Sequence, residues 1–303
     1  MFIVATAALI LVRGLIMETY NWNDQINYLK KSVGLYYNDD YLQFLVDKVW
    51  QIDKPIKVID FGCGFGHLGL RLLPLLPEGS TYTGIDLGDK LIEYAQDLFN
   101  GSPYQTEFFV GDIHRFTFEK KFDVSVCHAV LLHMSDPINV LKSMINCVKE
   151  NGRVIAFEPH WNGNHAGYYF DGIELSNVIP LGQLQELFER DVKSTGKDGN
   201  IGLKLPIYFN RLGLRNVQCR VSDKVNVLDS TVDSDLAQEQ YNAMQFNDPG
   251  DRDSFINALV GRGMLVSEAT RQYEAEKLLS KIFTTSQAVS YAPGMKITFG
   301  TVA

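Results

Sequence analysis

A strand that runs into a cluster of glycines and then into a helix is the feature that most constrains this chain. Residues 57–61 read KVIDF, residues 62–66 read GCGFG, and a helical pattern begins at His67. Glycine lets backbone N–H groups approach a ligand closely, and in open α/β sheets the ligand crevice lies beyond the carboxyl ends of the strands. The segment therefore predicts a ligand site at the edge of a parallel sheet.

The region from residue 55 to about residue 160 alternates short apolar runs with helical patterns. This alternation is typical of βαβ units and a parallel sheet. Helices are expected from His67, Asp89 and Asp136, the last with Asp136 as its N-cap and Gly152 just past its end. The expected strands are residues 57–61, 81–86, 107–112, 122–128 and 153–158.

The rest of the chain has longer connections. Two further strands are expected at residues 216–225 and 295–302, and the 69 residues between them are too many for a hairpin. That stretch predicts helices near 231–246, 251–261 and 267–283. We expect these helices to cover the sheet as a cap, together with residues 20–50 and 160–195.

Composition limits the classes of partner. The chain has 303 residues and a formal charge of −8, which argues against nonspecific binding of nucleic acid, since that usually needs clustered Lys and Arg. Its four cysteines are too few and too scattered for a disulfide framework or a zinc motif, so a reducing cytoplasm is the expected compartment. Small neutral or cationic partners fit this balance best.

The amino terminus is the one segment that argues against a cytoplasmic location. Residues 2–12 are almost continuously apolar, but this run is shorter than the roughly 17–25 residues that span a bilayer. We interpret residues 1–16 as an appended or mis-started leader, with Met17 opening the chain proper. A membrane-associated helix is the alternative.

The glycine spacing alone does not choose the ligand. Gly64, Gly66 and Gly69 also fit the GxGxxG pattern of dehydrogenases, so a nicotinamide-dependent oxidoreductase stays an alternative. However, Asp60 stands two positions before the first glycine, where its charge would repel a pyrophosphate and suit a cation such as an α-ammonium group. The context therefore favours a cationic ligand.

The stretch Asp60-Phe61-Gly62-Cys63-Gly64-Phe65-Gly66 resembles motif I of the class I S-adenosylmethionine-dependent methyltransferases, Asp/Glu-x-Gly-x-Gly-x-Gly. Three later segments at family spacing extend the resemblance: GIDL ending in Leu87, Gly111-Asp112-Ile113, and CHAVLLHM at residues 127–134, which is similar to the segment after the fourth strand of small-molecule methyltransferases. The resemblance implies S-adenosylmethionine as cofactor and the following cofactor-binding residues: Asp60, Gly62, Cys63, Gly64, Gly66, Asp86, Leu87, Asp112, Ile113 and His128.

Individual roles follow from the same resemblance. It implies that Asp86 accepts from both ribose hydroxyls, that Asp112 accepts from the adenine amine, and that His128 lies near the sulfonium or the carboxylate. Asp60 and the glycine turn would hold the methionine part. Each aspartate could instead only cap the turn or helix that follows it.

Methyl transfer from a sulfonium is an in-line displacement, which needs alignment and exclusion of water rather than a metal. An acceptor hydroxyl or amine also needs a base. We predict that His133 or His160 is this base and that Glu158 orients it. A metal site formed by Glu158, His160 and His165 lacks any fixed ligand spacing, so no metal is predicted.

Residues 158–170, EPHWNGNHAGYYF, are the candidate acceptor-contact segment because they concentrate aromatic and titratable side chains. These aromatics could line an apolar pocket or form a seam between lid and sheet. The segment after the fourth strand lacks the Asn/Asp-Pro-Pro-Tyr motif of base-amine methyltransferases, and no Pro-Cys pair supplies a nucleophile for cytosine methylation. A small-molecule acceptor is therefore expected, with no nucleic acid and no membrane as partner.

The predicted fold is an α/β, seven-stranded, mostly parallel, doubly wound sheet whose last strand is antiparallel, with an α-helical lid. The acceptor, the attacking atom (oxygen, nitrogen or carbon) and the oligomeric state stay open, and a non-catalytic cofactor-binding protein is a further alternative. The predicted segments are a leader (1–16), a helical cap segment (17–54), a Rossmann-like cofactor core (55–160), a lid segment (161–199), a closing helix and strands (200–225 and 293–303) and a helical lid insertion (226–292).

Overall fold

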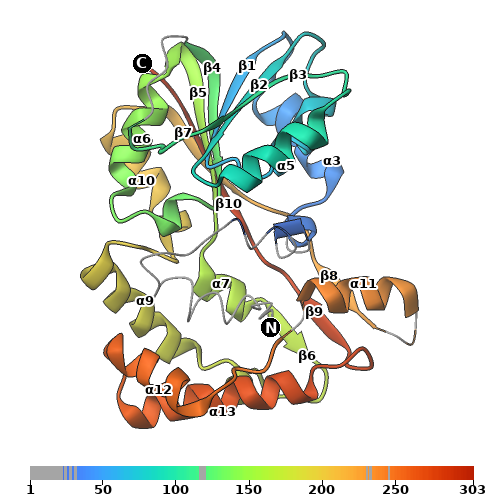
Figure 1. Ribbon diagram of the computed structural model, residues 1–303, viewed down its shortest axis with the longest axis vertical. Helices are drawn as coiled ribbons and strands as arrows, with labels where there is room; N and C mark the ends of the chain where they lie inside the picture. The colour runs from blue at the N-terminus through green and yellow to red at the C-terminus, as the bar shows by residue number, and fades with distance from the viewer. Residues whose placement is uncertain are drawn as a thin grey trace.

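A seven-stranded sheet forms the centre of the computed structural model, which describes residues 23, 26, 29, 30, 33–115, 121–229, 231, 234–244 and 246–303 (Figure 1). The strand order is β3-β2-β1-β4-β5-β10-β7, and only β10 runs antiparallel to its neighbours. The predicted sheet is therefore confirmed. The predicted leader, 1–16, lies outside the described residues. The strands are β1 (Lys57–Phe61), β2 (Thr81–Asp86), β3 (Gln105–Val110), β4 (Phe122–His128), β5 (Val148–Glu158), β7 (Arg215–Val221) and β10 (Lys296–Thr301).

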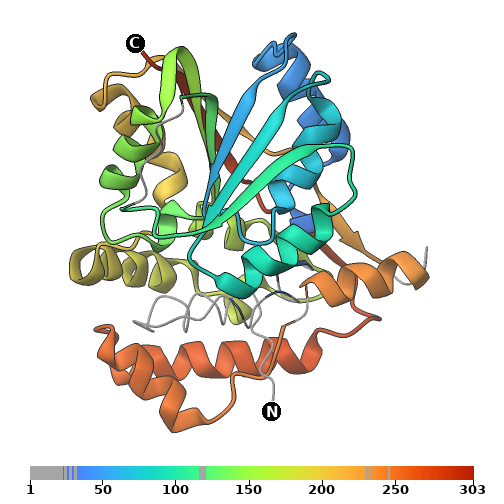
Figure 2. The same ribbon diagram turned by 45° about the horizontal axis from the view of Figure 1, so that its top comes forward.

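Helices cover both faces of this sheet (Figure 2). Side chains of a strand alternate between its two faces, so Val58 packs into one buried cluster and its neighbour Ile59 into the other. One face is covered by α3 (Asp39–Phe44), η3 (Leu45–Val49), α4 (His67–Leu72), η4 (Leu73–Leu75) and α5 (Asp89–Phe99), and the other by α6 (Pro137–Asn146) and α10 (Leu205–Arg211).

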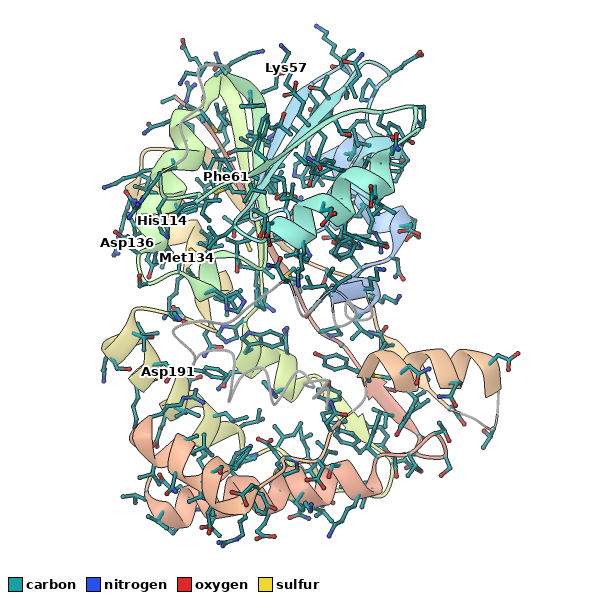
Figure 3. All side chains as sticks on the ribbon, viewed as in Figure 1. Lys57, Phe61, His114, Met134, Asp136 and Asp191 are labelled. Carbon is teal, nitrogen blue, oxygen red and sulfur yellow. The ribbon has the colours of Figure 1, made fainter. Side chains whose placement is uncertain are left out.

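The carboxyl ends of the parallel strands face the lid. Figure 3 shows Lys57 at the outer end of β1 and Phe61 at the end nearer the lid helices. The glycine turn, the end of β2 and the end of β4 are therefore on the lid side of the sheet. The short elements around this edge are η2 (Val33–Leu35), η5 (Leu131–His133), α7 (Trp161–Ala166) and η6 (Ile201–Leu203).

The lid contains the predicted helices and also a second sheet. The helices expected near 231–246, 251–261 and 267–283 are confirmed as α11 (Ser234–Met244), α12 (Arg252–Gly261) and α13 (Val266–Ile282), and α8 (Leu175–Val178) and α9 (Leu181–Thr195) precede them. Beside these helices the lid holds three short strands that the sequence did not predict, and they pair antiparallel in the order β6-β9-β8. They are β6 (Tyr168–Phe170), β8 (Asn226–Leu228) and β9 (Val289–Tyr291).

One helix boundary was predicted wrongly. Asp136 caps α6 as expected, since its Oδ1 accepts from Asn139 N at 3.0 Å, but the helix ends at Asn146 rather than just before Gly152. Gly152 instead lies inside β5, where an added Cβ would be 2.6 Å from the Asp123 carbonyl oxygen. Close approach of the neighbouring strand, not helix termination, requires this glycine.

Among the residues that the structure describes, no helix combines the length and the apolarity needed to cross a bilayer.

Candidate active site

The turn between β1 and α4 places three glycines in the left-handed backbone region. Gly62, Gly64 and Gly66 have φ angles of 72°, 54° and 79°. A Cβ at Gly62 would lie 2.6 Å from Val130 Cγ2, so packing explains that glycine. Among the described residues, a Cβ at Gly64 would meet only Leu29 Cδ1, at 4.0 Å. The space in front of Gly64 is therefore open enough for a ligand to approach the backbone.

Asp60, the fourth residue of β1, has a buried carboxyl group with only one of its two oxygens hydrogen-bonded among the described residues. It is 1% exposed, and its Oδ2 accepts a hydrogen bond from the hydroxyl of Tyr82 on β2. Its Oδ1 is buried without a hydrogen-bond partner among the described residues. Burial raises the pKa of Asp60 to about 7. An oxygen of this kind suits a cationic ligand group, which would favour the ionised form.

Asp86 connects the end of β2 to the glycine turn. Its Oδ2 accepts from Gly64 N at 2.9 Å, and its Oδ1 accepts from Gly88 N at 2.8 Å. Burial raises the pKa of Asp86, and the backbone hydrogen bonds from Gly88 and Gly64 oppose that shift. The next residue, Leu87, is 74% exposed, so its side chain is accessible to a ligand. The sequence located these residues, but the Asp86–Gly64 bond follows from the parallel pairing of β1 with β2.

The cysteine of the glycine turn is held inside the protein. The thiol of Cys63 is buried and donates to Gly64 O at 3.5 Å, and burial raises its pKa well above the ordinary value. Cys63 therefore contributes its backbone and its packing to the turn rather than a thiolate.

Asp112 and Ile113 lie beyond β3, which ends at Val110 rather than at the predicted residue 112. Asp112 Oδ1 accepts from His114 N at 2.9 Å, and its Oδ2 lies 3.6 Å from Arg115 Nε. Ile113 is buried. The side chain of Asp112 thus stabilises its own turn, and its role toward adenine stays a prediction.

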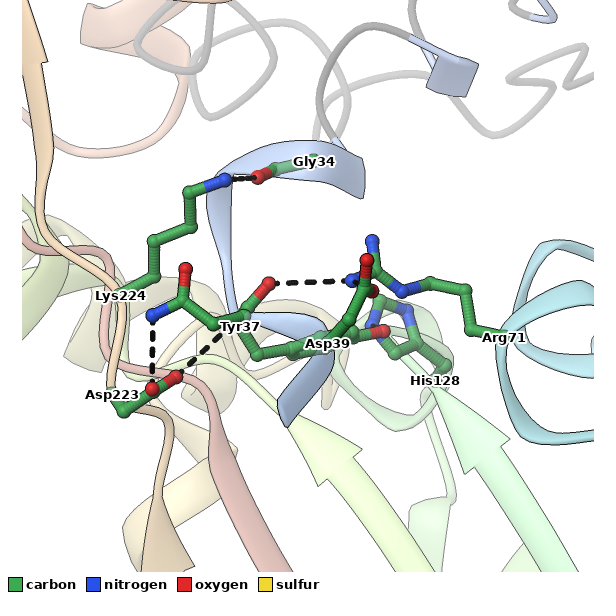
Figure 4. A network of polar contacts seen from close by, with 8 residues as sticks. Gly34, Tyr37, Asp39, Arg71, His128, Asp223 and Lys224 are labelled. Carbon is green, nitrogen blue, oxygen red and sulfur yellow. Dashed lines mark hydrogen bonds and ion pairs between the residues drawn. The ribbon is translucent and has the colours of Figure 1, made fainter. Parts of the chain in front are cut away.

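His128 ends β4 within a buried polar cluster (Figure 4). Its Nε2 lies 3.2 Å from the hydroxyl of Tyr37, which comes from a segment 91 residues earlier in the sequence. Burial lowers the pKa of His128 to about 4, so its imidazole is uncharged at neutral pH. Sequence reasoning missed Tyr37, because no local pattern marks a contact over that separation.

The segment that carries Tyr37, residues 33–41, is called the strap here because it crosses the strand ends. Asn38 Nδ2 donates to Asp223 Oδ2 at 2.9 Å, and Lys224 Nζ donates to Gly34 O at 2.6 Å (Figure 4). These bonds join the strap to the connection between β7 and β8. The strap is thereby fixed at its outer side while Tyr37 points to the end of β4.

Described residues before the strap also contact the cofactor edge. Asn23 Nδ2 donates to Asp89 Oδ1 at 2.7 Å at the start of α5, and Lys30 Nζ lies 4.1 Å from the centroid of the Tyr94 ring. With Leu29 near Gly64, these contacts place Asn23, Leu29 and Lys30 beside the glycine turn and α5.

Glu158, at the end of β5, holds the loop that follows β4. Its carboxylate accepts from the backbone amides of Val130 at 2.9 Å, Leu131 at 2.7 Å and Leu132 at 3.3 Å. Burial raises its pKa to about 7 despite these donors. Both oxygens of Glu158 bind backbone amides of the loop that leads to His133, and its orientation of the base stays a prediction. Glu158 is a positioning residue for η5, which carries His133.

The two predicted bases flank one loop. Asp198 N donates to Leu132 O at 3.1 Å, beside His133, and the Nδ1 of His160 lies 3.2 Å from Asn200 O. Burial lowers the pKa of His133 to about 4 and lowers that of His160 as well. Both imidazoles are therefore uncharged at neutral pH, the form that accepts a proton.

The aromatic residues after β5 divide between the two interpretations. Tyr168 stacks on Tyr291 with ring centroids 3.8 Å apart and contacts Phe246, and these side chains belong to the same buried cluster as the sheet residues. For Tyr168 this packing favours the interpretation as a seam between lid and sheet, and acceptor contact by this segment stays a prediction. Tyr169 is exposed and lies outside it.

Within the described residues, no group of three or more His, Cys, Asp and Glu side chains is arranged to hold a metal ion.

The strand order, the glycine turn after β1 and the carboxylate at the end of β2 agree with a class I S-adenosylmethionine-dependent methyltransferase domain. Residues 52–196 match a family model described as a methyltransferase domain. The match favours this class over the nicotinamide-dependent oxidoreductases that share the GxGxxG pattern.

Curated relatives match the same region. A malonyl-[acyl-carrier protein] O-methyltransferase of Acetivibrio thermocellus is 32% identical over 134 residues, which cover 42% of this chain and 46% of the relative. A ubiquinone biosynthesis O-methyltransferase of Pseudomonas fluorescens is 32% identical over 127 residues, which cover 41% of this chain and 53% of the relative. The chain thus spans about half the length of these relatives.

A solved structure extends the likeness of the fold beyond the domain. The phosphoethanolamine N-methyltransferase 2 of Haemonchus contortus, in complex with S-adenosyl-L-methionine, superposes with a TM-score of 0.53 at 13% identity. The superposition covers 96% of this chain and 59% of that one. At this identity the likeness concerns the fold alone.

Proposed function

We propose that this protein transfers the methyl group of S-adenosylmethionine to an oxygen or nitrogen atom of a small organic acceptor and releases S-adenosylhomocysteine. The single observation that carries the proposal is the set of groups around the glycine turn: the space at Gly64 and the buried Asp60 oxygen, which has no partner among the described residues, together with the carboxylate of Asp86. The match of residues 52–196 to a methyltransferase domain supports it.

The residues present fit the cofactor. Asp60 and the backbone at Gly64 would hold the amino acid part, Asp86 the ribose, and Leu87 with Asp112 and Ile113 the adenine, as the family resemblance implies. When bound, S-adenosylmethionine supplies an electrophilic methyl group on a sulfonium.

The protein's own contribution is mainly alignment and exclusion of water. Tyr168, Tyr291 and Phe246 pack on one another within the lid and belong to the same buried cluster as residues of the large sheet. This packing would help the lid to exclude water from the strand ends. Glu158 fixes the loop after β4 through three amide bonds, which holds His133 on a short helix rather than on a mobile loop. An acceptor between this loop and the lid would be held close to the glycine turn.

We propose His133 or His160 as the base that takes the acceptor's proton. The hydrogen bond between His160 and the Asn200 carbonyl requires the proton on Nδ1, which leaves Nε2 as the acceptor. His133 is uncharged well below neutral pH, because burial lowers its pKa to about 4. Either histidine is therefore in the basic form under physiological conditions.

Two measurements test the function. Isothermal titration calorimetry with S-adenosylmethionine, S-adenosylhomocysteine and NADH identifies the cofactor class, and tight binding of NADH alone would refute the proposal. Formation of S-adenosylhomocysteine with a panel of phenols, carboxylic acids, alcohols and amines then tests catalysis. Cofactor binding with no product from any acceptor would favour the non-catalytic alternative.

The remaining predictions concern partners and place of action. A small molecule as the methyl acceptor agrees with the names of the curated relatives. The cytoplasm as compartment and nucleic acid as an excluded partner stay predictions from composition and charge. Size-exclusion chromatography with light scattering would supply the oligomeric state.

A further inference from the structure

Two buried asparagines of the lid have side-chain amide atoms without a hydrogen-bond partner among the described residues. Asn164 of α7 is 1% exposed, and both its Nδ2 and its Oδ1 lack a partner. Asn226 of β8 is also 1% exposed, and its Oδ1 lacks a partner although its Nδ2 donates to Leu35 O at 2.9 Å and to Tyr291 O at 3.2 Å. Buried polar groups are usually hydrogen-bonded, so these three atoms point to a ligand that satisfies them.

The two asparagines lie around the same end of β9. Asn226 is on β8, where the register pairs it with Tyr291, the last residue of β9. On the β6 side of β9, Ala292 N donates to Gly167 O at 2.9 Å, and Gly167 N donates to Asn164 O at 3.1 Å. The strand order β6-β9-β8 thus brings Asn164 and Asn226 to the end of β9 from its two sides.

Both asparagines are connected to groups that the proposed reaction uses. The backbone N–H of Asn164 donates to His160 O at 2.9 Å, so Asn164 lies one helical turn beyond a candidate base. The bond from Asn226 Nδ2 to Leu35 O reaches the strap, and the strap carries Tyr37 to the end of β4. The part of the lid that holds the unsatisfied atoms is therefore joined to the candidate base and to the strand ends.

The chemistry of these atoms favours an uncharged ligand group. A carboxamide carries no net charge; its oxygen accepts hydrogen bonds and its nitrogen donates two. The imidazole of His165, which follows Asn164, is also uncharged at neutral pH, because burial lowers its pKa to about 4. A charged ligand group would lose its hydration here without gaining a counter-charge from these side chains. A hydroxyl group suits them, since it both donates and accepts.

We propose that Asn164 and Asn226 bind the methyl acceptor and that this acceptor is an uncharged compound with at least two hydroxyl groups. The assignment rests on the proposed function and narrows its acceptor class. The two unsatisfied oxygens need two O–H donors, one for Asn164 Oδ1 and one for Asn226 Oδ1, and a hydroxyl oxygen accepts from Asn164 Nδ2. The stacked rings of Tyr291 and Tyr168, beside Asn226 in the lid sheet, offer the apolar part of the acceptor an aromatic neighbour.

A thermal melt tests the binding role without any ligand. Asn164→Leu keeps a side chain of similar size and removes the two unsatisfied atoms, so the melting temperature of the ligand-free protein should rise by about 2–4 °C. Asn200→Leu is the matched control, because Asn200 is a buried asparagine whose Oδ1 accepts from Asn162 N at 3.0 Å. Its melting temperature should fall. A melting temperature of Asn164→Leu at or below that of wild type would assign the side chain to the fold and overturn the proposal.

Turnover tests the class of acceptor. Formation of S-adenosylhomocysteine is measured with phenols, alcohols, carboxylic acids and amines, and phenol is compared with catechol, which has a second hydroxyl group. The kcat/KM of wild type should be highest for uncharged members with two or more hydroxyl groups. In Asn164→Leu the KM for these acceptors should rise about 10- to 100-fold, and the preference for catechol over phenol should fall. The Kd for S-adenosylmethionine, measured by calorimetry, should not change. Asn226→Leu should reduce the same preference.

The outcomes separate this site from the function on which it rests. A preference of wild type for carboxylic acids or amines, or an unchanged KM in Asn164→Leu, would overturn the acceptor site alone. Failure of wild type to bind S-adenosylmethionine, or to form product with any acceptor, would instead refute the proposed function.

Discussion

The buried carboxyl group of Asp60 gives a prediction in which proton release reports cofactor binding. Its Oδ1 lacks a partner, and its environment holds the pKa at about 7 instead of 3.8. The change to be made is Asp60→Asn, which keeps the shape of the side chain and removes its charge. The prediction is that binding of S-adenosylhomocysteine expels a proton from Asp60, because the cofactor's ammonium group favours the ionised carboxylate.

The expected proton release and its effect on affinity follow from the shift in the pKa of Asp60. A shift of one unit corresponds to about 1.4 kcal/mol, so burial favours the neutral form of Asp60 by about 4 kcal/mol. At pH 6 roughly nine in ten Asp60 groups are protonated, so binding of the ammonium releases close to one proton, and the affinity should rise about tenfold per pH unit up to neutrality. Above pH 8 the release should vanish.

Calorimetry in two buffers of different ionisation enthalpy measures the released protons at each pH. Subtracting the values for Asp60→Asn removes the contributions of the other titratable groups, Asp86 and His128 among them. Equal proton release by wild type and Asp60→Asn between pH 5.5 and 8, or an affinity independent of pH, would refute the reasoning.

The stability of the ligand-free protein should also depend on pH through Asp60. Because the folded-state pKa of Asp60 is raised, its contribution to stability is fully present below pH 3.8 and is lost as the pH rises through about 7. Thermal melts of wild type and Asp60→Asn over the same pH range measure this effect. The melting temperature of Asp60→Asn should not show the fall that wild type shows as the pH rises through about 7.

Three further predictions concern the cofactor edge and the base. Asp86→Asn should weaken S-adenosylmethionine by about 1–3 kcal/mol in calorimetry, since a charge-assisted acceptor is lost; an unchanged Kd would contradict its role. Gly64→Val places a branched side chain at a φ of 54° and fills the open space, so cofactor binding should be lost while circular dichroism still reports the fold, with stability lower by about 1–2 kcal/mol. His133→Ala or His160→Ala should reduce turnover about 100- to 10,000-fold without changing cofactor affinity, and full turnover in both variants would place proton removal elsewhere.

Local pattern predicted the cofactor half of the site well. The strand–glycine–helix stretch placed Gly64 and the acidic residues at strand ends, and β1, β2 and β4 have the predicted bounds. The helices of the lid were also found by their periodicity. Local pattern failed at Gly152, because a glycine that ends a helix and a glycine pressed against a neighbouring strand look alike in sequence.

Several contacts depend on pairing over long separations. The lid sheet joins Tyr168 to Tyr291, and Tyr37 reaches His128 from 91 residues away. The contacts of Glu158 also depend on the fold, because its carboxylate binds the amides of a loop 26–28 residues earlier.

The amino-acid sequence by itself determined the parallel sheet, the glycine turn and the position of each acidic group along the chain, because backbone conformation and side-chain periodicity are set by neighbours within a few residues. Only the tertiary structure decided which of those groups face one another. The partnering of Asp86 with Gly64, the contact of Tyr37 with His128, and the unsatisfied atoms of Asn164 and Asn226 arise when separate elements are packed together and water is excluded between them.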